Sequence, residues 1–337
     1  MLTSEVGAPA RSAAARVLVT GASGMLGRRT AERLVAAGHD VRTFQRRQAG
    51  VPGAADSLGS LADDDAVRRA VEGRDAVVHL AAKVSVSGPR REYEEINVEG
   101  TRRLLAAARA AGVTRFVQVS SPSVAHAGDS LVGVPAGRAE PELARGHYAR
   151  TKAAAERLAL AADGPGLAVV AVRPHLVWGP GDTQLVGRIV ERARAGRLPL
   201  LDQGAALIDS VYVDNAADAL VAALDRAEDA HGEAFVVTNG EPRPVGDLLA
   251  GICLAAGVRP PAWRVPAVVA RAAGALVEAV WAVRPGPDEP PMTRFLAEQL
   301  STAHWFDQRR TRAGLDWTPA VTIDEGLARL AAHERGA

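Results

Sequence analysis

The sequence predicts an α/β protein, with a doubly wound parallel sheet followed by a smaller C-terminal cap. Three observations support this. In the first half, short β-rich runs alternate with helical stretches, as expected of a sheet covered on both faces. A glycine-rich turn directly follows the first run. From about residue 179 the local composition changes, with proline and glycine clusters at 179–181, 240–246, 257–266 and 284–291.

The first half contains the regular elements of this sheet. Strands are expected at 16–20, 40–45, 76–80, 115–120 and 168–173, and helices at 26–37, 64–72, 92–111 and 148–161. Helices of this length between strands give right-handed crossovers and a parallel sheet. Later runs at 210–213 and 234–238 are expected to rejoin it. We therefore expect a flexible leader (1–14), a core (15–180) and a part that is mainly cap (181–337).

The composition excludes several classes of protein. The 337 residues carry a net charge of +1, so no basic excess points to nucleic acid. The single cysteine, Cys253, excludes an internal disulfide and a multi-cysteine zinc site, and no metal is expected. The single cysteine fits a reducing cytoplasm, where the protein is expected, and residues 1–15 lack the apolar core of a secretory signal.

The longest apolar stretch, 265–283, is interrupted by Arg271 and Glu278 on one helical face. This pattern indicates an amphipathic helix and argues against a membrane-spanning one. The favoured interpretation is a helix that packs against the core. A helix that forms a wall of an apolar substrate pocket, or one that lies on a membrane surface, is the alternative. Membrane-surface contact is not expected.

Lysine is rare in this chain. Of the 40 basic residues, only Lys83 and Lys152 are lysines and the other 38 are arginines. An arginine stays protonated, whereas a lysine is a compact charge with a tunable pKa. The two lysines are therefore candidates for a chemical role.

A strand, a glycine turn and a helix start follow one another at 16–27. Gly21 allows the chain to reverse, Gly24 allows close approach to a pyrophosphate, and Gly27 allows the helix to pack on the strand. The N–H groups of the first helical turn then face the phosphates, which predicts a Rossmann-type dinucleotide-binding core. The candidate contacts are Gly21, Ser23, Gly24, Met25, Leu26 and Gly27. The spacing G-x-x-G-x-x-G resembles that of the extended short-chain dehydrogenase/reductases.

The second strand bears on the choice of dinucleotide. In this family an acid at its end accepts the ribose hydroxyls of NAD, and the matching residue here is Gln45, followed by Arg46 and Arg47. A guanidinium can bind a 2′-phosphate that a carboxylate would repel. NADP(H) is therefore expected, with Arg46 as the first candidate for the phosphate, and NAD(H) is the alternative. The family often has an aspartate where this chain has Ser60.

Tyr148 and Lys152 stand four residues apart and share one face of a helix. The ammonium can lower the pKa of the phenol and hydrogen-bond the nicotinamide ribose. A purely structural pair is the less favoured interpretation.

Hydroxyl groups follow the strand at 115–120, at the edge where ligands bind in open α/β folds. By resemblance to the family pattern S-S-x-x-V, Ser121 matches the serine that hydrogen-bonds the substrate carbonyl. Ser120 or Ser123 could be the donor instead, because Pro122 is unusual for the broader superfamily.

Further segments resemble extended-family signatures, namely 79–83, 97–101, 173–182 and 212–217. The resemblance places around the cofactor Leu61, Leu80, Ala81, Ala82, Lys83, Val119, Tyr148, Lys152, Pro174 and Val177. Candidate substrate contacts are Lys83, Ser123, His175 and Trp178. A packed or surface position is the favoured alternative for His175.

The segments 97–101, 173–182 and 307–327 resemble the 3β-hydroxysteroid dehydrogenase/isomerase family. Within it, 121–126, 178–196 and 289–306 look closer to the bacterial NADPH-dependent 2-alkyl-3-oxoalkanoate reductases of olefin biosynthesis. The resemblance implies reduction of a β-keto acid by hydride transfer, with Ser121, Tyr148 and Lys152 as catalytic residues. The helix at 265–283 and the segment 284–291 would be walls for two apolar tails.

Three alternatives stay open. They are a sterol dehydrogenase with the same catalytic residues, a nucleotide-sugar epimerase or dehydratase, and a non-catalytic dinucleotide sensor. The resemblance also implies a homodimer packed through helices near 92–111 and 148–161, and an assembly with other olefin-pathway enzymes as a further option. Lys83 or an arginine of the cap could bind the substrate carboxylate.

Overall fold

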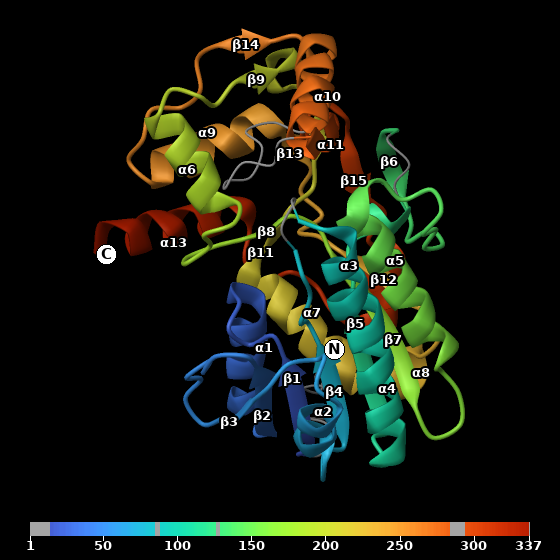
Figure 1. Ribbon diagram of the computed structural model, residues 1–337. Coiled ribbons are helices and arrows are strands. Elements are labelled where there is room, and N and C mark those ends of the chain that lie inside the picture. Colours follow the sequence, from blue (N-terminus) through green and yellow to red (C-terminus); the bar gives the residue numbers. More distant parts are fainter. Residues whose placement is uncertain (1–13, 85–87, 126–128, 284–293, 337) are drawn as a thin grey trace, which may run out of the picture.

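The computed structural model describes residues 14–84, 88–125, 129–283 and 294–336. Its centre is a seven-stranded sheet in the order β12-β7-β5-β4-β1-β2-β3, in which all neighbours are parallel (Figure 1). The strands are β1 (Arg16–Thr20), β2 (Asp40–Gln45), β3 (Ala55–Leu58), β4 (Ala76–His79), β5 (Arg115–Val119), β7 (Ala168–Pro174) and β12 (Ala234–Val237). The expected doubly wound fold is confirmed.

Helices cover both faces because successive residues of a strand point to opposite sides. On β1, Val17 and Val19 belong to one core and Leu18 to the other. The first core is covered by α1 (Met25–Ala36), α7 (Val213–Asp225), α8 (Ala227–Ala230) and α12 (Arg309–Leu315). The second is covered by α2 (Asp64–Val71), α4 (Gly100–Ala110) and α5 (Gly146–Ala161).

The regular elements expected in the first half form within two residues of their expected bounds. The helix expected at 92–111 consists of α3 (Arg90–Tyr93), a π-helical turn (Glu94–Glu99) and α4. Such π-helical turns are rare and often occur at functional sites.

The expectation for the run at 210–213 is wrong in one respect. It forms β11 (Val211–Tyr212), but β11 pairs with β8 (Val177–Trp178) in a separate two-stranded sheet, because α7 begins directly at Val213. The other late run, β12, does join the main sheet beside β7. The edge strand β3 is not among the expected strands.

The cap lies above the carboxyl edge of the sheet (Figure 1). Its helices are α6 (Val186–Arg194), α9 (Val245–Ala255), α10 (Ala267–Val283), α11 (Arg294–Ser301) and α13 (Ile323–Gly336). A four-stranded sheet has the order β13 (Arg243–Pro244), β10 (Leu207–Ile208), β15 (His304–Phe306) and β6 (Leu131–Val134). A second pair joins β14 (Arg264–Val265) to β9 (Leu200–Leu201), and short 3₁₀ turns occur at Pro122–Ala125 and Asp202–Gly204.

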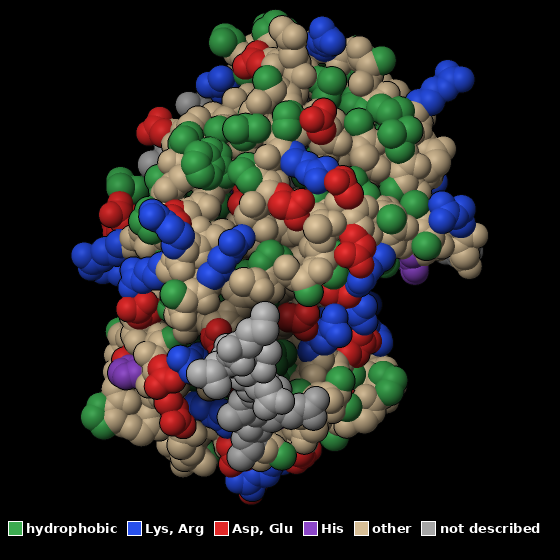
Figure 2. Space-filling model, turned by 180° about the vertical axis from the view of Figure 1, so that it is seen from behind, with side chains coloured by type: hydrophobic (Ala, Val, Ile, Leu, Met, Phe, Trp, Pro, Cys, Tyr) green, Lys and Arg blue, Asp and Glu red, His purple; other side chains and the backbone are tan. Residues whose placement is uncertain are grey.

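Helix α10 differs from the expected amphipathic pattern. Val268, Val269 and Leu276 are 74%, 55% and 68% exposed, whereas Arg271 is half-buried. Figure 2 shows hydrophobic side chains gathered over the upper part of the molecule, which is the cap. Within the described residues, none of the helices is long and apolar enough to span a membrane.

Asp214 fixes the nucleotide-binding helix α1 against α7. Its buried carboxylate accepts from Arg29 at 2.5 Å and also pairs with Arg33 at 3.4 Å, both on α1. Arg329 of α13 reaches the same carboxylate at 3.2 Å. The segment 212–217, singled out in the sequence, therefore has a structural role in joining three helices.

Candidate active site

A cavity of about 1110 Å³ opens where the carboxyl ends of β1, β2, β4 and β5 face the cap. Its wall includes every cofactor contact predicted from the sequence: Gly21, Ser23, Gly24, Met25, Leu26, Gly27, Arg46, Leu61, Leu80, Ala81, Ala82, Lys83, Val119, Tyr148, Lys152, Pro174 and Val177. Ser121 lines it as well. Residues from seven separate segments of the chain thus meet at one crevice.

The glycine turn has room for a ligand at only one of its three glycines. At Gly21, where φ is +78°, a Cβ would lie 2.8 Å from the backbone nitrogen of Ala81. At Gly27 it would lie 2.3 Å from the carbonyl oxygen of Gly21. At Gly24 the nearest atom would be 3.6 Å away, and α1 starts there without a side-chain cap. The first N–H groups of α1 are therefore left for a phosphate, which fits a dinucleotide.

His79 holds the turn against β4. The backbone N–H of Ala81 donates to Oγ1 of Thr20 at 3.0 Å, and that hydroxyl bonds Nδ1 of His79 at 2.7 Å. On the other side, Nε2 of His79 bonds Oγ1 of Thr101 at 3.0 Å, and this hydroxyl donates to the carbonyl of Asn97. Burial and the charge of Lys152 lower the pKa of His79 to about 3. The imidazole is thus neutral, and each of its nitrogens has a partner.

At the end of β2, Gln45 is buried and donates from Nε2 to Oδ1 of Asp56 at 2.8 Å. Asp56 also accepts from Thr43 at 2.5 Å, and these hydrogen bonds lower the pKa of its carboxyl group. Arg46 and Arg47 are exposed and line the cavity. This end of the cavity therefore presents an amide and two guanidinium groups.

Tyr148 and Lys152 lie on α5 and both line the cavity. The ammonium of Lys152 is buried and donates to the carbonyl of Val119 at 2.5 Å. Burial lowers the pKa of Lys152 to about 8, while Glu156 acts in the opposite direction. The side chain of Lys152 is therefore fixed beside the end of β5.

The phenol of Tyr148 differs from expectation. Burial raises its pKa to about 12, and a hydrogen bond with Ser121 lowers it in part. Lys152 is not among the groups that shift it, so the expected acidification by the ammonium is not observed. The physical reason is that loss of hydration at the phenol outweighs the nearby hydrogen bond.

The three serines after β5 have different surroundings. Ser121 bonds Tyr148, and its Oγ lies 2.9 Å from Oγ of Ser123. Ser123 is not among the described residues that line the cavity. Ser120 lines it, and its buried Oγ has no protein partner. Ser121 is therefore the serine in contact with the tyrosine.

Two candidate substrate contacts lie elsewhere. His175 is buried, its Nδ1 bonds the carbonyl of Asp209 at 2.7 Å, and its ring packs against Phe306. Trp178 is fully buried and donates to Oγ of Ser210 at 3.0 Å. Neither belongs to the described wall of the cavity. Both side chains pack in the interior.

The expected walls for apolar tails also differ. The part of α10 whose side chains are described does not line the cavity, and the segment 284–291 falls outside the described residues. Apolar lining comes instead from Val84, Ile96 and Leu176.

Sequence reasoning did not single out Asn97 as a site residue. Its side chain accepts from the backbone N–H of Lys83 at 2.7 Å and donates to Oγ1 of Thr151 at 3.0 Å. Asn97 lies in the π-helical turn and is buried. The signal that could have identified Asn97 is its amide side chain, because it lies in a segment that resembles the family and is followed by a helix.

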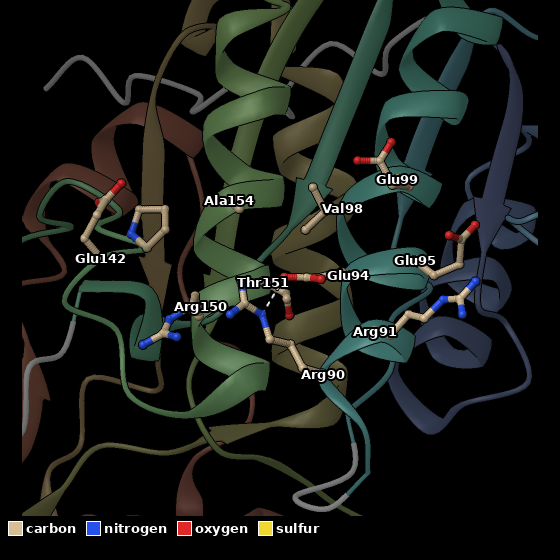
Figure 3. Close-up of a pocket in the computed structure, with 11 residues that line it drawn as sticks. Arg90, Arg91, Glu94, Glu95, Val98, Glu99, Glu142, Arg150, Thr151 and Ala154 are labelled. Atoms are coloured by element: carbon tan, nitrogen blue, oxygen red, sulfur yellow. Dashed lines mark hydrogen bonds and ion pairs between the residues drawn. The ribbon is translucent and has the colours of Figure 1, made fainter.

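A second cavity of about 570 Å³ lies between α3, the π-helical turn and α5 (Figure 3). Its wall is charged, and Arg90 pairs with Glu94 at 2.6 Å. It is formed by the helices that the resemblance expects at a subunit contact.

Comparison with known proteins decides the family. The model of the NAD dependent epimerase/dehydratase family matches residues 17–238. The chain belongs to this family. A 2-alkyl-3-oxoalkanoate reductase from Stenotrophomonas maltophilia is 42% identical over 328 residues, covering 94% of this chain and 98% of the relative. Another, from Shewanella oneidensis, is 36% identical over 93% of this chain and 85% of its own.

Solved structures agree on the fold of this epimerase/dehydratase family member. The structure titled "MoeE5 in complex with UDP-glucose and NAD" has a TM-score of 0.73 and 26% identity, covering 95% of this chain and 99% of the other. The protein is therefore a nicotinamide-dinucleotide-dependent enzyme of the extended short-chain dehydrogenase/reductase class. The family match ends near β12, whereas the two relatives extend through most of the cap.

Proposed function

We propose that the protein reduces 2-alkyl-3-oxoalkanoates to 2-alkyl-3-hydroxyalkanoates with NADPH. The observation that carries the proposal is the Ser121–Tyr148 hydrogen bond at the wall of the dinucleotide-sized cavity. Similarity to reductases of this name over more than nine-tenths of the chain supports the substrate class.

Three side chains would carry the reaction. NADPH held along the glycine turn and by Lys152 would supply the hydride for the ketone carbon. Tyr148 donates its phenolic proton to the carbonyl oxygen, and its raised pKa keeps that proton in place at neutral pH. Ser121 donates to the same oxygen and orients it. Lys152, already anchored on the carbonyl of Val119, would hold the nicotinamide ribose.

The preference for NADPH rests on the end of β2. Arg46 and Arg47 are exposed there, and Gln45 supplies an amide where NAD-binding relatives of this class place a carboxylate. No acidic side chain belongs to the described lining contributed by β2 and by residues 59–61. A guanidinium in this place can bind the 2′-phosphate through two hydrogen bonds, and Arg46 is our first candidate.

The remaining parts of the proposal concern partners. Two alkyl tails would extend past Val84, Ile96 and Leu176 toward the cap. The charged face in Figure 3 is our proposed contact for a homodimer, and an assembly with other olefin-pathway enzymes is the wider form of that proposal.

A substrate panel tests the function. Purified protein is assayed with NADPH or NADH against 2-alkyl-3-oxo acids, sterols in their 3-oxo form and nucleotide sugars. We expect turnover of the 3-oxo acids with NADPH preferred, and a loss of about 10²- to 10⁴-fold in Tyr148→Phe, the range typical of a lost general acid. NADPH binding, followed by its fluorescence, should persist in the variant. Turnover of sterols alone, or full activity in Tyr148→Phe, would contradict the proposal.

A further inference from the structure

Both lysines of this arginine-rich chain lie in the wall of the same cavity. The proposed mechanism uses Lys152 and assigns no step of the reaction to Lys83. We propose that Lys83 binds the carboxylate of the 3-oxo acid and makes the site selective for acids over neutral ketones. This inference rests on the proposed function.

The chemistry of the substrate restricts where such a cation can lie. In a 3-oxo acid a single carbon separates the carboxylate from the ketone, so the cation must be close to Ser121 and Tyr148. The cationic side chains of the described cavity wall are Arg46, Arg47, Lys83, Arg91 and Lys152. Arg46 and Arg47 follow β2, three strands from the β5 end that carries Ser121, or about 14 Å at the usual strand spacing. Lys83 follows β4, which is the direct neighbour of β5.

Two side chains connect Lys83 to the catalytic helix. Asn97 accepts from the backbone N–H of Lys83 at 2.7 Å, donates to its carbonyl at 3.2 Å, and donates to Thr151 at 3.0 Å. Thr151 lies on α5 between Tyr148 and Lys152. The buried Asn97 thus sets the backbone of Lys83 at a constant distance from the proton donor.

The ammonium of Lys83 has a defined position. It lies 5.2 Å from the centre of the buried Tyr93 ring, which in turn packs 5.9 Å from the ring of His147. At Gly88 a Cβ would come within 3.2 Å of Cε of Lys83. A cation above an aromatic ring and beside a glycine is positioned without being enclosed.

The present partner of Lys83 can be exchanged. Nζ lies 2.8 Å from Glu92, whose side chain is 56% exposed, and ion pairs with such exposed partners are weak. A substrate carboxylate can therefore replace Glu92. Arg91 is exposed and extends toward Glu95 beside the second cavity (Figure 3), so it is the weaker candidate.

The test uses stable substrates in the oxidative direction. Wild type and variants are given NADP⁺ with a 2-alkyl-3-hydroxyalkanoic acid or its methyl ester. We expect Lys83→Met to raise KM for the acid about 10- to 100-fold, as for a lost charge-assisted hydrogen bond, and to leave KM for the ester and for NADP⁺ unchanged. Lys83→Arg should restore part of the preference for the acid.

Two control variants distinguish binding of the substrate carboxylate by Lys83 from a purely structural role. Glu92→Gln removes the competing carboxylate, so KM for the acid should fall or stay constant, whereas loss of a structural ion pair would affect Lys83→Met and Glu92→Gln alike. Arg91→Gln should have no effect on either substrate. Equal losses on acid and ester, or a raised KM for NADP⁺, would overturn the role of Lys83. Turnover of sterols alone by wild type would instead overturn the proposed function, and this assignment with it.

Discussion

At Tyr148, burial and hydrogen bonding shift the pKa of the phenol in opposite directions, and burial prevails. The phenol therefore stays protonated at neutral pH, which is the form that ketone reduction requires. Lys152 carries the opposite shift for the same reason, because burial disfavours its charged form. Both side chains are therefore in their protonated form at neutral pH.

The pH profile should report Lys152. With a pKa of about 8, its ammonium is present below that pH and is lost above it. We expect kcat/KM for reduction to fall about tenfold per pH unit above pH 8, measured from pH 6 to 10 with NADPH varied. Lys152→Arg, which stays charged, should have lower activity but a flat profile over this range. If kcat/KM of Lys152→Arg still falls above pH 8, a group other than Lys152 causes the fall.

The position of these residues on one helix could be predicted from sequence, but their ionisation could not. Tyr148 and Lys152 are recognisable because their spacing along one helix is local. The pKa of Tyr148 depends on burial by segments distant in the chain, which no local pattern encodes. His175 shows the same limit, since only the fold reveals that it packs against Phe306.

At the scale of elements, α5 is attached to the sheet by a buried ion pair. Arg173 of β7 donates to Glu156 from Nε at 2.8 Å and from Nη2 at 2.5 Å, and both side chains are almost fully buried. Arg173 also donates to the carbonyl of Gly137 at 2.7 Å. Because Glu156 lies one turn after Lys152, this pair also helps to position Tyr148 and Lys152.

Removing one member of this pair should be costly. Glu156→Gln leaves the guanidinium of Arg173 buried without its counter-charge, and we expect the free energy of unfolding to fall by about 3–5 kcal/mol in urea titrations. The double variant Glu156→Leu with Arg173→Met should recover much of that loss, since replacing both partners removes the buried charge. A Glu156→Gln protein as stable as wild type would show that the pair contributes little.

Elements with a buried apolar pattern were predictable, and those without one were not. β1 and β4 alternate between two cores, so their residues form clear apolar runs. β3 lies at the edge of the sheet with mostly exposed residues and gives no such run. The run at 210–213 is mainly apolar because β11 and the start of α7 are both buried. Burial alone does not show whether a strand joins the main sheet or pairs separately, as β11 does with β8.

At the scale of the whole molecule, the cap and core are joined by pairings between distant parts of the chain. β6, from the first half, pairs with β15 near the C-terminus (Figure 1). No periodicity in the sequence encodes this pairing, so the division at residue 180 does not describe which segments lie together. The same contact region brings α11 close to the start of α5.

The ion pair between Arg145 and Glu298 joins the cap to the helix that carries Tyr148. Arg145 directly precedes α5, three residues before Tyr148, and its Nη1 lies 2.6 and 2.7 Å from the two carboxylate oxygens of Glu298 on α11. Glu298 is 4% exposed, so water cannot take the place of Arg145 as it could for a surface acid.

Glu298→Gln should therefore loosen the cap over the active site. We expect kcat/KM for the 3-oxo acid to fall about tenfold, the size of one lost charge-assisted hydrogen bond, with NADPH binding unchanged because the glycine turn lies in the core. Glu325→Gln is the matched control, since it removes an acid of an exposed pair with Arg329 at 2.6 Å. Its kcat/KM should stay within twofold of wild type. If both variants behave alike in this assay, the cap is held by its strand pairing and the buried carboxylate has no part in positioning Tyr148.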